Sequence, residues 1–320
     1  MTAQTHNQVT QPSSEERVWA AIAHSSVVLF GFGYVLCAAL WATQRRKSAY
    51  VAFQSLQALG YQVISLTVGV VFVLLVPLLL FPLTLGELKS LSASASGANP
   101  GALPFLSISI SYGLILGMLV IYVLLGIAGA ALSLAGQDFK YPLLGTRLAR
   151  YVSYEPAARD HEQRSDLNEE REDRWVAAMS HATVVVIMWG LLLPLVAWAT
   201  EKDRSRFLRF QALQALVYQA LGLVAYFAAM FLYMLGVLGL GIGMMLGASA
   251  QDPSGPALVV LIVSSLMILI FLLLLLLLPL FQILAQWAAI QILRGHDYQY
   301  PILGRWLRGR LDQPAERAAA

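Results

Sequence analysis

Residues 271–280 read FLLLLLLLPL, and this leucine run lies inside a longer apolar segment, Ala257 to Leu293. A helix needs about twenty apolar residues to cross a bilayer, and the core of a soluble domain rarely hides such a run. The composition of the whole chain supports the same interpretation, because 58% of its 320 residues are hydrophobic, 12% are charged and the mean hydropathy is +0.67. This composition predicts an integral membrane protein and excludes a disordered chain, a disulfide scaffold and a soluble metabolic enzyme.

Five further apolar segments precede this one, and none alternates with the period of a strand, so a β-barrel is excluded. Each segment is long enough to cross as a helix. The sequence therefore predicts an all-α polytopic membrane protein with about six membrane helices. The segments span residues 18–42, 53–85, 105–135, 175–199, 210–246 and 257–293.

The chain is an internal duplication. Adding 157 to the residue number carries Arg17 to Gln62 onto the second half without a gap, and FQSLQALGYQ (53–62) recurs as FQALQALVYQ (210–219). With an offset of 159, GQDFKYPLLG (136–145) recurs as GHDYQYPILG (295–304). Each half is therefore one three-segment unit. The expected organisation is a polar tail (1–16), a first three-helix repeat (17–150), a charged linker (151–173), a second three-helix repeat (174–309) and a C-terminal tail (310–320).

The order of these motifs resembles a known family. Ala20-x-x-Ala23-His24-Ser25, a Trp followed by a basic loop, Phe207-x-x-Phe210-Gln211-Ala-Leu-Gln-Ala and a closing Gly-x-x-x-x-Tyr-Pro look like a bacterial membrane domain related to the Tic-twenty component of the chloroplast inner-envelope import machinery. Here the domain is duplicated, and glutamine stands at Gln54 and Gln211, where relatives often carry His or Asn. The resemblance implies a multi-pass protein of a bacterial-type cytoplasmic (inner) membrane, and a translocon-like or scaffold subunit.

A polar stripe recurs in both halves. Residues spaced i, i+3 and i+7 share one helix face, which should point at another helix, a cavity or the headgroup region because exposure to lipid is costly. We favour hydrogen bonding between helices, with the two repeats packed through these faces, over the wall of a hydrophilic pathway. The residues of this face are Gln54, Gln57, Tyr61, Gln62, Gln211, Gln214, Tyr218 and Gln219.

His24 and His181 occupy equivalent places in the two repeats. Two facing imidazoles could hold haem or a metal, but neither residue has a companion at ligand spacing. We expect each histidine to bond a neighbouring backbone group or glutamine, and we expect no metal and no cofactor.

Glycines spaced by four residues create smooth helix faces, at which we expect close helix packing rather than a hinge. These positions are Gly113, Gly117, Gly239, Gly243 and Gly247. Basic residues flank apolar segments instead of forming one stripe, so they predict contact with lipid headgroups and not with nucleic acid. The headgroup-facing residues are expected to be Arg45, Arg46, Lys47, Lys202, Arg204 and Arg206.

The charges create a conflict over topology. If all six segments cross, the 21 Lys and Arg residues divide into eleven and ten, without bias. Within each half, however, the same loops are basic, so both halves favour the same orientation. Either the repeats are inverted, or the first segment of each repeat enters the membrane and returns. The uninterrupted apolarity of residues 18–42 favours six crossings with inverted repeats.

Motifs for nucleophilic, metal-dependent or phosphate chemistry are missing from the sequence, and no acidic pair lies inside an apolar segment. We therefore expect a non-enzymatic protein without cofactors, whose partners are the bilayer and other membrane proteins or a second copy. The leading hypothesis is a translocon-like or scaffold subunit of a membrane assembly. The alternative is a transporter or channel for a small uncharged solute, with its site between the repeats.

Overall fold

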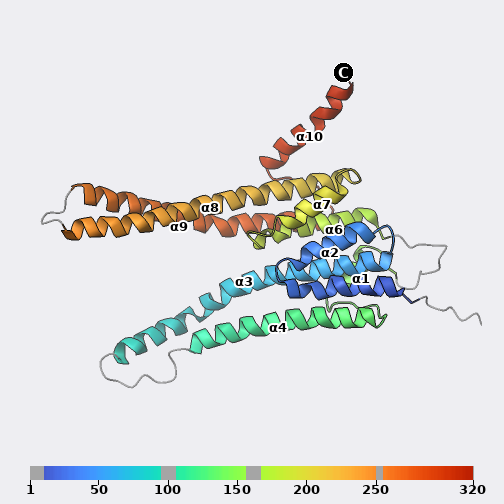
Figure 1. Cartoon of the computed structure of the whole chain (residues 1–320), viewed down its shortest axis with the longest axis horizontal. Coiled ribbons are helices and arrows are strands. Elements are labelled where there is room, and N and C mark those ends of the chain that lie inside the picture. Colours follow the sequence, from blue (N-terminus) through green and yellow to red (C-terminus); the bar gives the residue numbers. More distant parts are fainter. Residues whose placement is uncertain (1–10, 95–105, 156–166, 250–254, 320) are drawn as a thin grey trace, which may run out of the picture.

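The computed structural model describes residues 11–94, 106–155, 167–249 and 255–319, and within these ranges it is helical without strands. Figure 1 shows two similar halves, one above the other. The first half contains α1 (Ser14–Ser25), α2 (Gly33–Gln44), α3 (Ala49–Ser94), α4 (Leu106–Leu134) and α5 (Gly145–Tyr151). The second contains α6 (Glu169–Ala182), α7 (Leu192–Glu201), α8 (Arg206–Ser249), α9 (Gly255–Leu293) and α10 (Leu303–Ala319).

The first apolar segment of each repeat folds back on itself. Helix α1 has 12 residues, and after a turn at Phe30 and Gly31, both with positive φ, the 12 residues of α2 return beside it. The Cys37 thiol of α2 lies 3.3 Å from the carbonyl of Ala23 in α1. In the second repeat α6 and α7 have 14 and 10 residues. At 1.5 Å per residue, helices of this length reach only about 15 to 21 Å, less than the hydrocarbon core requires.

Four helices in the described part of the chain are long and apolar enough to cross a membrane: Ala49–Gly86, Leu106–Leu134, Arg206–Gly247 and Gly255–Leu293. These helices support a polytopic membrane protein, and the prediction of six crossings is not confirmed. Helices α1 and α2 of residues 18–42 pack against α3, α4 and α7, while the turn between them exposes Val28, Leu29, Phe30 and Phe32. Helix α3 continues to Ser94, beyond the end of the predicted apolar segment at residue 85.

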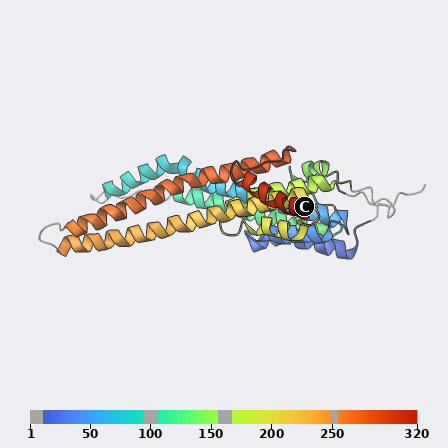
Figure 2. The same ribbon diagram turned by 90° about the horizontal axis from the view of Figure 1, so that it is seen from above.

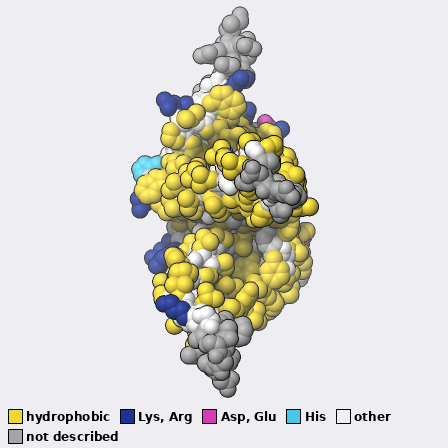
Figure 3. Space-filling view, turned by 90° about the vertical axis from the view of Figure 1, so that its left-hand side faces the viewer, with side chains coloured by type: hydrophobic (Ala, Val, Ile, Leu, Met, Phe, Trp, Pro, Cys, Tyr) yellow, Lys and Arg dark blue, Asp and Glu magenta, His cyan; other side chains and the backbone are white. Residues whose placement is uncertain are grey.

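The spanning hairpins present their apolar side chains outward, as a membrane protein does to lipid. Leu79 of α3 and Met245 of α8 are each 74% exposed, and Leu276 of α9 is 71% exposed. Figure 3, which looks onto the end of these hairpins, shows a surface made mainly of hydrophobic side chains.

The two repeats are parallel. The hairpin ends at Ser94 and Leu106 and those at Ser249 and Gly255 lie at the same end of the molecule in both views (Figures 1 and 2), and the short helices gather at the other end. The expectation of inverted repeats is therefore wrong. Among the residues that the structure describes, every Lys and Arg except Lys89 lies toward the end with the short helices, so the basic residues gather on one side of the spanning hairpins.

The spanning hairpins differ in how tightly they pack. A Cβ atom on Gly239 of α8 would collide with Ser264 of α9, and one on Gly243 would lie 2.9 Å from Leu261, so these glycines permit close helix contact as predicted. The first hairpin instead leaves an apolar cavity of about 520 Å³ between α3 and α4. At the other predicted positions, Gly113, Gly117 and Gly247, a Cβ would have no atom of the described residues within 4 Å.

Candidate functional site

His24 lies at the centre of a polar cluster inside the first repeat. Helix α1 places it fully buried, with Nδ1 3.0 Å from the hydroxyl of Tyr141 and Nε2 2.8 Å from the side-chain oxygen of Gln54. Gln54 donates its own amide to Asp138 and to the carbonyl of Phe139, so its oxygen is left to accept. Nε2 therefore carries the proton, and Nδ1 accepts from the Tyr141 hydroxyl.

Gln57 attaches the segment 136–145, here called the closing segment, to α3. Its side-chain oxygen accepts the backbone N–H of Tyr141 at 2.9 Å, and its amide donates to Phe139 at 3.0 Å. Gly136, with φ of +78°, ends α4 and starts the reversal. Gly145 lies so close to the Gln57 oxygen that a Cβ would collide with it. The glycines and the Tyr-Pro pair that recur in the sequence thus all lie at the connection between α4 and α5.

The second repeat contains the same cluster. His181 Nδ1 lies 3.0 Å from the Tyr300 hydroxyl, and Nε2 lies 3.2 Å from the Gln211 oxygen. Gln214 accepts the backbone N–H of Tyr300 at 3.1 Å and donates to the carbonyl of Tyr298. The duplication therefore reproduces these hydrogen bonds as well as the helices.

Both imidazoles are held neutral by their surroundings. Burial lowers the pKa of His24 and of His181 to about 4. The hydrogen bonds to Gln54 and Gln211 oppose this lowering but are the smaller effect. Each ring nitrogen already has a partner within its own repeat, as the sequence predicted for the glutamine contacts. The arrangement suits structural locking more than proton transfer near neutral pH or metal ligation.

The rest of the polar face also bonds within its own repeat. The Tyr61 hydroxyl donates to the carbonyl of Tyr122, and the Tyr218 hydroxyl to that of Phe281. Gln62 donates to Ser26, and Gln219 to the carbonyl of Ser180. The prediction of hydrogen bonding between helices thus describes these contacts, but the idea that the repeats pack against each other through this face is wrong.

A buried charged network joins the two repeats instead. Arg45, at the end of α2, lies 3.3 Å from Glu172, 2.9 Å from Asp173 and 3.3 Å from Glu201, all of which belong to the second repeat. Trp41 of α2 donates its indole N–H to Glu172 at 2.7 Å and stacks under the Arg45 guanidinium. The Arg45 side chain is only 6% exposed. Arg45 therefore faces the other repeat, and its predicted contact with headgroups is wrong.

The charged network is not duplicated. Lys202 and Trp198 occupy the positions equivalent to Arg45 and Trp41, but Lys202 is exposed and lies over the Trp198 ring. Gln44 stands where the second repeat has Glu201. In the sequence only Glu201 departs in charge, because Glu172 and Asp173 are equivalent to Glu15 and Glu16, and Arg45 is equivalent to Lys202. The structure nevertheless brings Arg45 and the three carboxylates together in one place only.

Three carboxylates surround the buried Arg45, and one of them, Glu201, also lies 3.4 Å from Arg204. Burial raises the pKa of Glu172 to about 7, and Arg45 opposes this rise. Burial also raises the pKa of Glu201. Ionisation of Glu172 therefore changes near neutral pH.

Comparison with protein families matches the two repeats separately. Residues 15–148 and 172–307 each match the magnetosome magnetite crystal formation protein family (MamF/MmsF). The chain belongs to this family. Searches of curated proteins and of solved structures found no match. A duplicated membrane domain is thereby established for this member of the MamF/MmsF family, whereas the resemblance to the Tic-twenty family stays a prediction.

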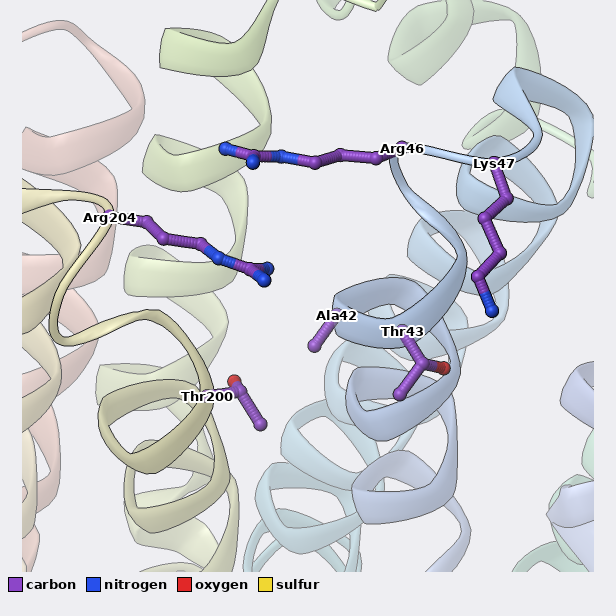
Figure 4. Close-up of a pocket in the computed structure, with 6 residues that line it drawn as sticks. All are labelled: Ala42, Thr43, Arg46, Lys47, Thr200 and Arg204. Atoms are coloured by element: carbon purple, nitrogen blue, oxygen red, sulfur yellow. The ribbon is translucent and has the colours of Figure 1, made fainter.

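The other five basic residues that were predicted to contact lipid headgroups lie at the surface. Arg46, Lys47 and Arg204 line an open cavity between the ends of α2 and α7, shown in Figure 4. Lys202 and Arg206 are exposed outside this cavity. Their predicted contact with headgroups stays a prediction.

Proposed function

We propose that the protein is a non-enzymatic membrane subunit that takes part in magnetite crystal formation as a structural component of the magnetosome membrane. The observation that carries this proposal is the match of both repeats to a family described by that process. The polar clusters around His24 and His181 support it, because their side chains are engaged in holding each repeat together.

The amino-acid composition between the paired spanning helices favours an indirect role in mineral formation. In the sequence, residues 86–104 and 248–256, which include the ends of α3, α8 and α9, are rich in Ser, Ala and Gly, and their acidic residues are Glu87 and Asp252. Carboxylate oxygens are hard ligands suited to metal ions such as iron, so a mineral-binding surface would be expected to be richer in them. We infer that the protein acts through the membrane and through other membrane proteins or further copies of itself.

Complementation tests this proposal. In a magnetite-forming bacterium that carries this gene, deletion should reduce crystal size measured by electron microscopy, and the wild-type gene should restore it. For a structural role, restoration should follow the amount of folded protein in the membrane. Arg209→Gln, at an exposed position on α8, is the control expected to restore fully.

His24→Gln separates a structural from a catalytic role, because it keeps a polar side chain beside Gln54. A variant that restores crystals in proportion to its folded amount supports the proposal. A variant present at the wild-type amount, with wild-type thermal stability and no crystals, would show that His24 has a chemical role and would contradict it.

A translocon-like role, which the Tic-twenty resemblance implies, and a small-solute transporter are alternatives. Both require a pathway associated with the repeats. The cavity that the structure describes between the repeats is rimmed by Arg46, Lys47 and Arg204, which suits an anion better than an uncharged solute. The structural role is therefore preferred.

A further inference from the structure

A basic cavity of about 430 Å³ lies where the two repeats meet, between the last turn of α2 and the last turn of α7. In Figure 4, Arg46 from one side and Arg204 from the other extend into the space between the helices. Positions 43 and 47 of the first repeat are equivalent to 200 and 204 of the second, so both copies supply the lining. The lining residues are Ala42, Thr43, Arg46, Lys47, Thr200 and Arg204.

The two arginines of this cavity are only partly neutralised. Arg204 lies 3.4 Å from Glu201, but that carboxylate also lies 3.3 Å from Arg45 and is shared between them. Arg46 forms no ion pair with the residues that the structure describes. Like charges that extend into one open space repel each other, and an anion placed between them removes this repulsion. Guanidinium groups match the geometry of phosphate oxygens.

The floor of the cavity is apolar. The Thr43 hydroxyl donates to the carbonyl of Ala39 at 2.9 Å, and the Thr200 hydroxyl donates to that of Val196 at 2.8 Å. Both hydroxyl protons are thus occupied by their own helices, and the site can offer an anion few donors other than its basic side chains. The arginines lie beyond the threonines along α2 and α7, on the side away from the spanning hairpins (Figures 1 and 4).

We propose that this cavity binds a negatively charged phosphate group between Arg46 and Arg204, and that the phosphate belongs to an anionic phospholipid. The apolar floor and basic rim fit an amphiphilic phosphate ester better than a free inorganic ion. The proposal is independent of the role in crystal formation. It also adds to the general contact of basic loops with headgroups, because it assigns one cavity, built by both repeats, to one chemical group.

Binding to the purified full-length protein in neutral detergent tests the proposal. The probes are phosphatidylglycerol, phosphatidylcholine as the zwitterionic comparison, and sodium phosphate against sodium chloride at equal ionic strength. Retained lipid is measured by native mass spectrometry and affinity by the ligand-dependent rise of Tm. The variants are Arg46→Gln, Arg46→Gln with Arg204→Gln, and the control Arg209→Gln, which removes an exposed arginine outside the cavity.

Phosphatidylglycerol should bind at least tenfold more tightly than phosphatidylcholine. Its affinity should fall at least threefold in Arg46→Gln, which breaks no ion pair of the fold, and at least tenfold in the double variant. The control should stay within twofold of the wild type. If sodium phosphate gives the same rise and the same variant pattern while phosphatidylglycerol adds nothing, the site holds free phosphate and the lipid assignment is overturned. Equal binding of both lipids without a phosphate effect, or equal affinity in all variants, overturns the site itself.

Discussion

Gln57 and Tyr141 are joined by a hydrogen bond of 2.9 Å from the backbone N–H of Tyr141 to the side-chain oxygen of Gln57, and the same bond joins Gln214 and Tyr300 at 3.1 Å in the other repeat. In both cases the two partners belong to one repeat. The glutamines therefore hold each repeat's closing segment, residues 136–145 and 295–304, and do not join the repeats.

Gln57→Leu and Gln214→Leu should consequently destabilise independently. Each leaves a buried N–H without its acceptor, at a cost of about 1 to 3 kcal/mol. Because the two sites share no partner, their effects on the free energy of unfolding should add to within about 0.5 kcal/mol. Unfolding in mild detergent measures both single variants and the double variant. A larger coupling energy would mean that the two glutamines share an interface after all.

The charged network predicts opposite results at two equivalent positions. Arg45→Ala leaves three buried carboxylates without the guanidinium that they share. It should lower the free energy of unfolding by about 3 to 5 kcal/mol, the range for breaking a buried ion pair. Lys202→Ala, its repeat equivalent, removes an exposed side chain and should cost less than about 1 kcal/mol. Similar losses of thermal stability in the two variants would argue against the buried network.

The raised pKa of Glu172 predicts a dependence of stability on pH. A carboxyl whose pKa rises on folding to about 7 binds more protons in the folded than in the unfolded state between pH 4.5 and 7. Its ionisation therefore destabilises the fold as pH rises towards 7, whereas the lowered pKa values of His24 and His181 stabilise the fold as pH rises to about 6.5. The Glu172 effect is isolated by comparing Tm of Glu172→Gln, which keeps an acceptor for Trp41, with Tm of the wild type at each pH. The variant should gain Tm relative to the wild type between about pH 5 and 8, and a difference that does not change with pH would show that Glu172 does not titrate in this range.

The glycines of the two spanning hairpins should differ in their tolerance of a methyl group. Gly239→Ala forces a Cβ into Ser264 and should destabilise the α8–α9 hairpin by about 1 to 3 kcal/mol. Gly113→Ala meets open space and should be neutral or stabilising by up to about 1 kcal/mol, because alanine favours helix. Thermal unfolding of both variants measures the difference. Equal destabilisation would mean that another surface covers Gly113.

Much of the architecture followed from the sequence. The leucine run predicted the membrane, and the offset of 157 predicted the duplication, because both depend on local composition and on self-similarity. The return of residues 18–42 did not follow, since an apolar run looks the same whether lipid or protein covers it. Only the charges of the loops indicate that this segment folds back, and the length of its apolar run favours a crossing instead.

The candidate sites were likewise predicted only in part. The repeated pattern identified His24, His181 and the glutamines, and it predicted that these residues are hydrogen-bonded. It could not identify their partners Tyr141 and Tyr300, which lie far along the chain. The sequence does not reveal the network around Arg45, because this network joins α2 to carboxylates of the other repeat, and self-similarity does not show which residues of different repeats meet.

The orientation of the two repeats is the central claim, and cysteine accessibility measures it directly. In a Cys37→Ser background, single cysteines replace Lys47 and Asp203, which are exposed at the end with the short helices, and Lys89, which is exposed at the opposite end. A membrane-impermeant maleimide applied to sealed, oriented vesicles should label positions 47 and 203 from the same face and position 89 only from the other. Labelling of positions 47 and 203 from opposite faces would contradict parallel repeats and would support six crossings.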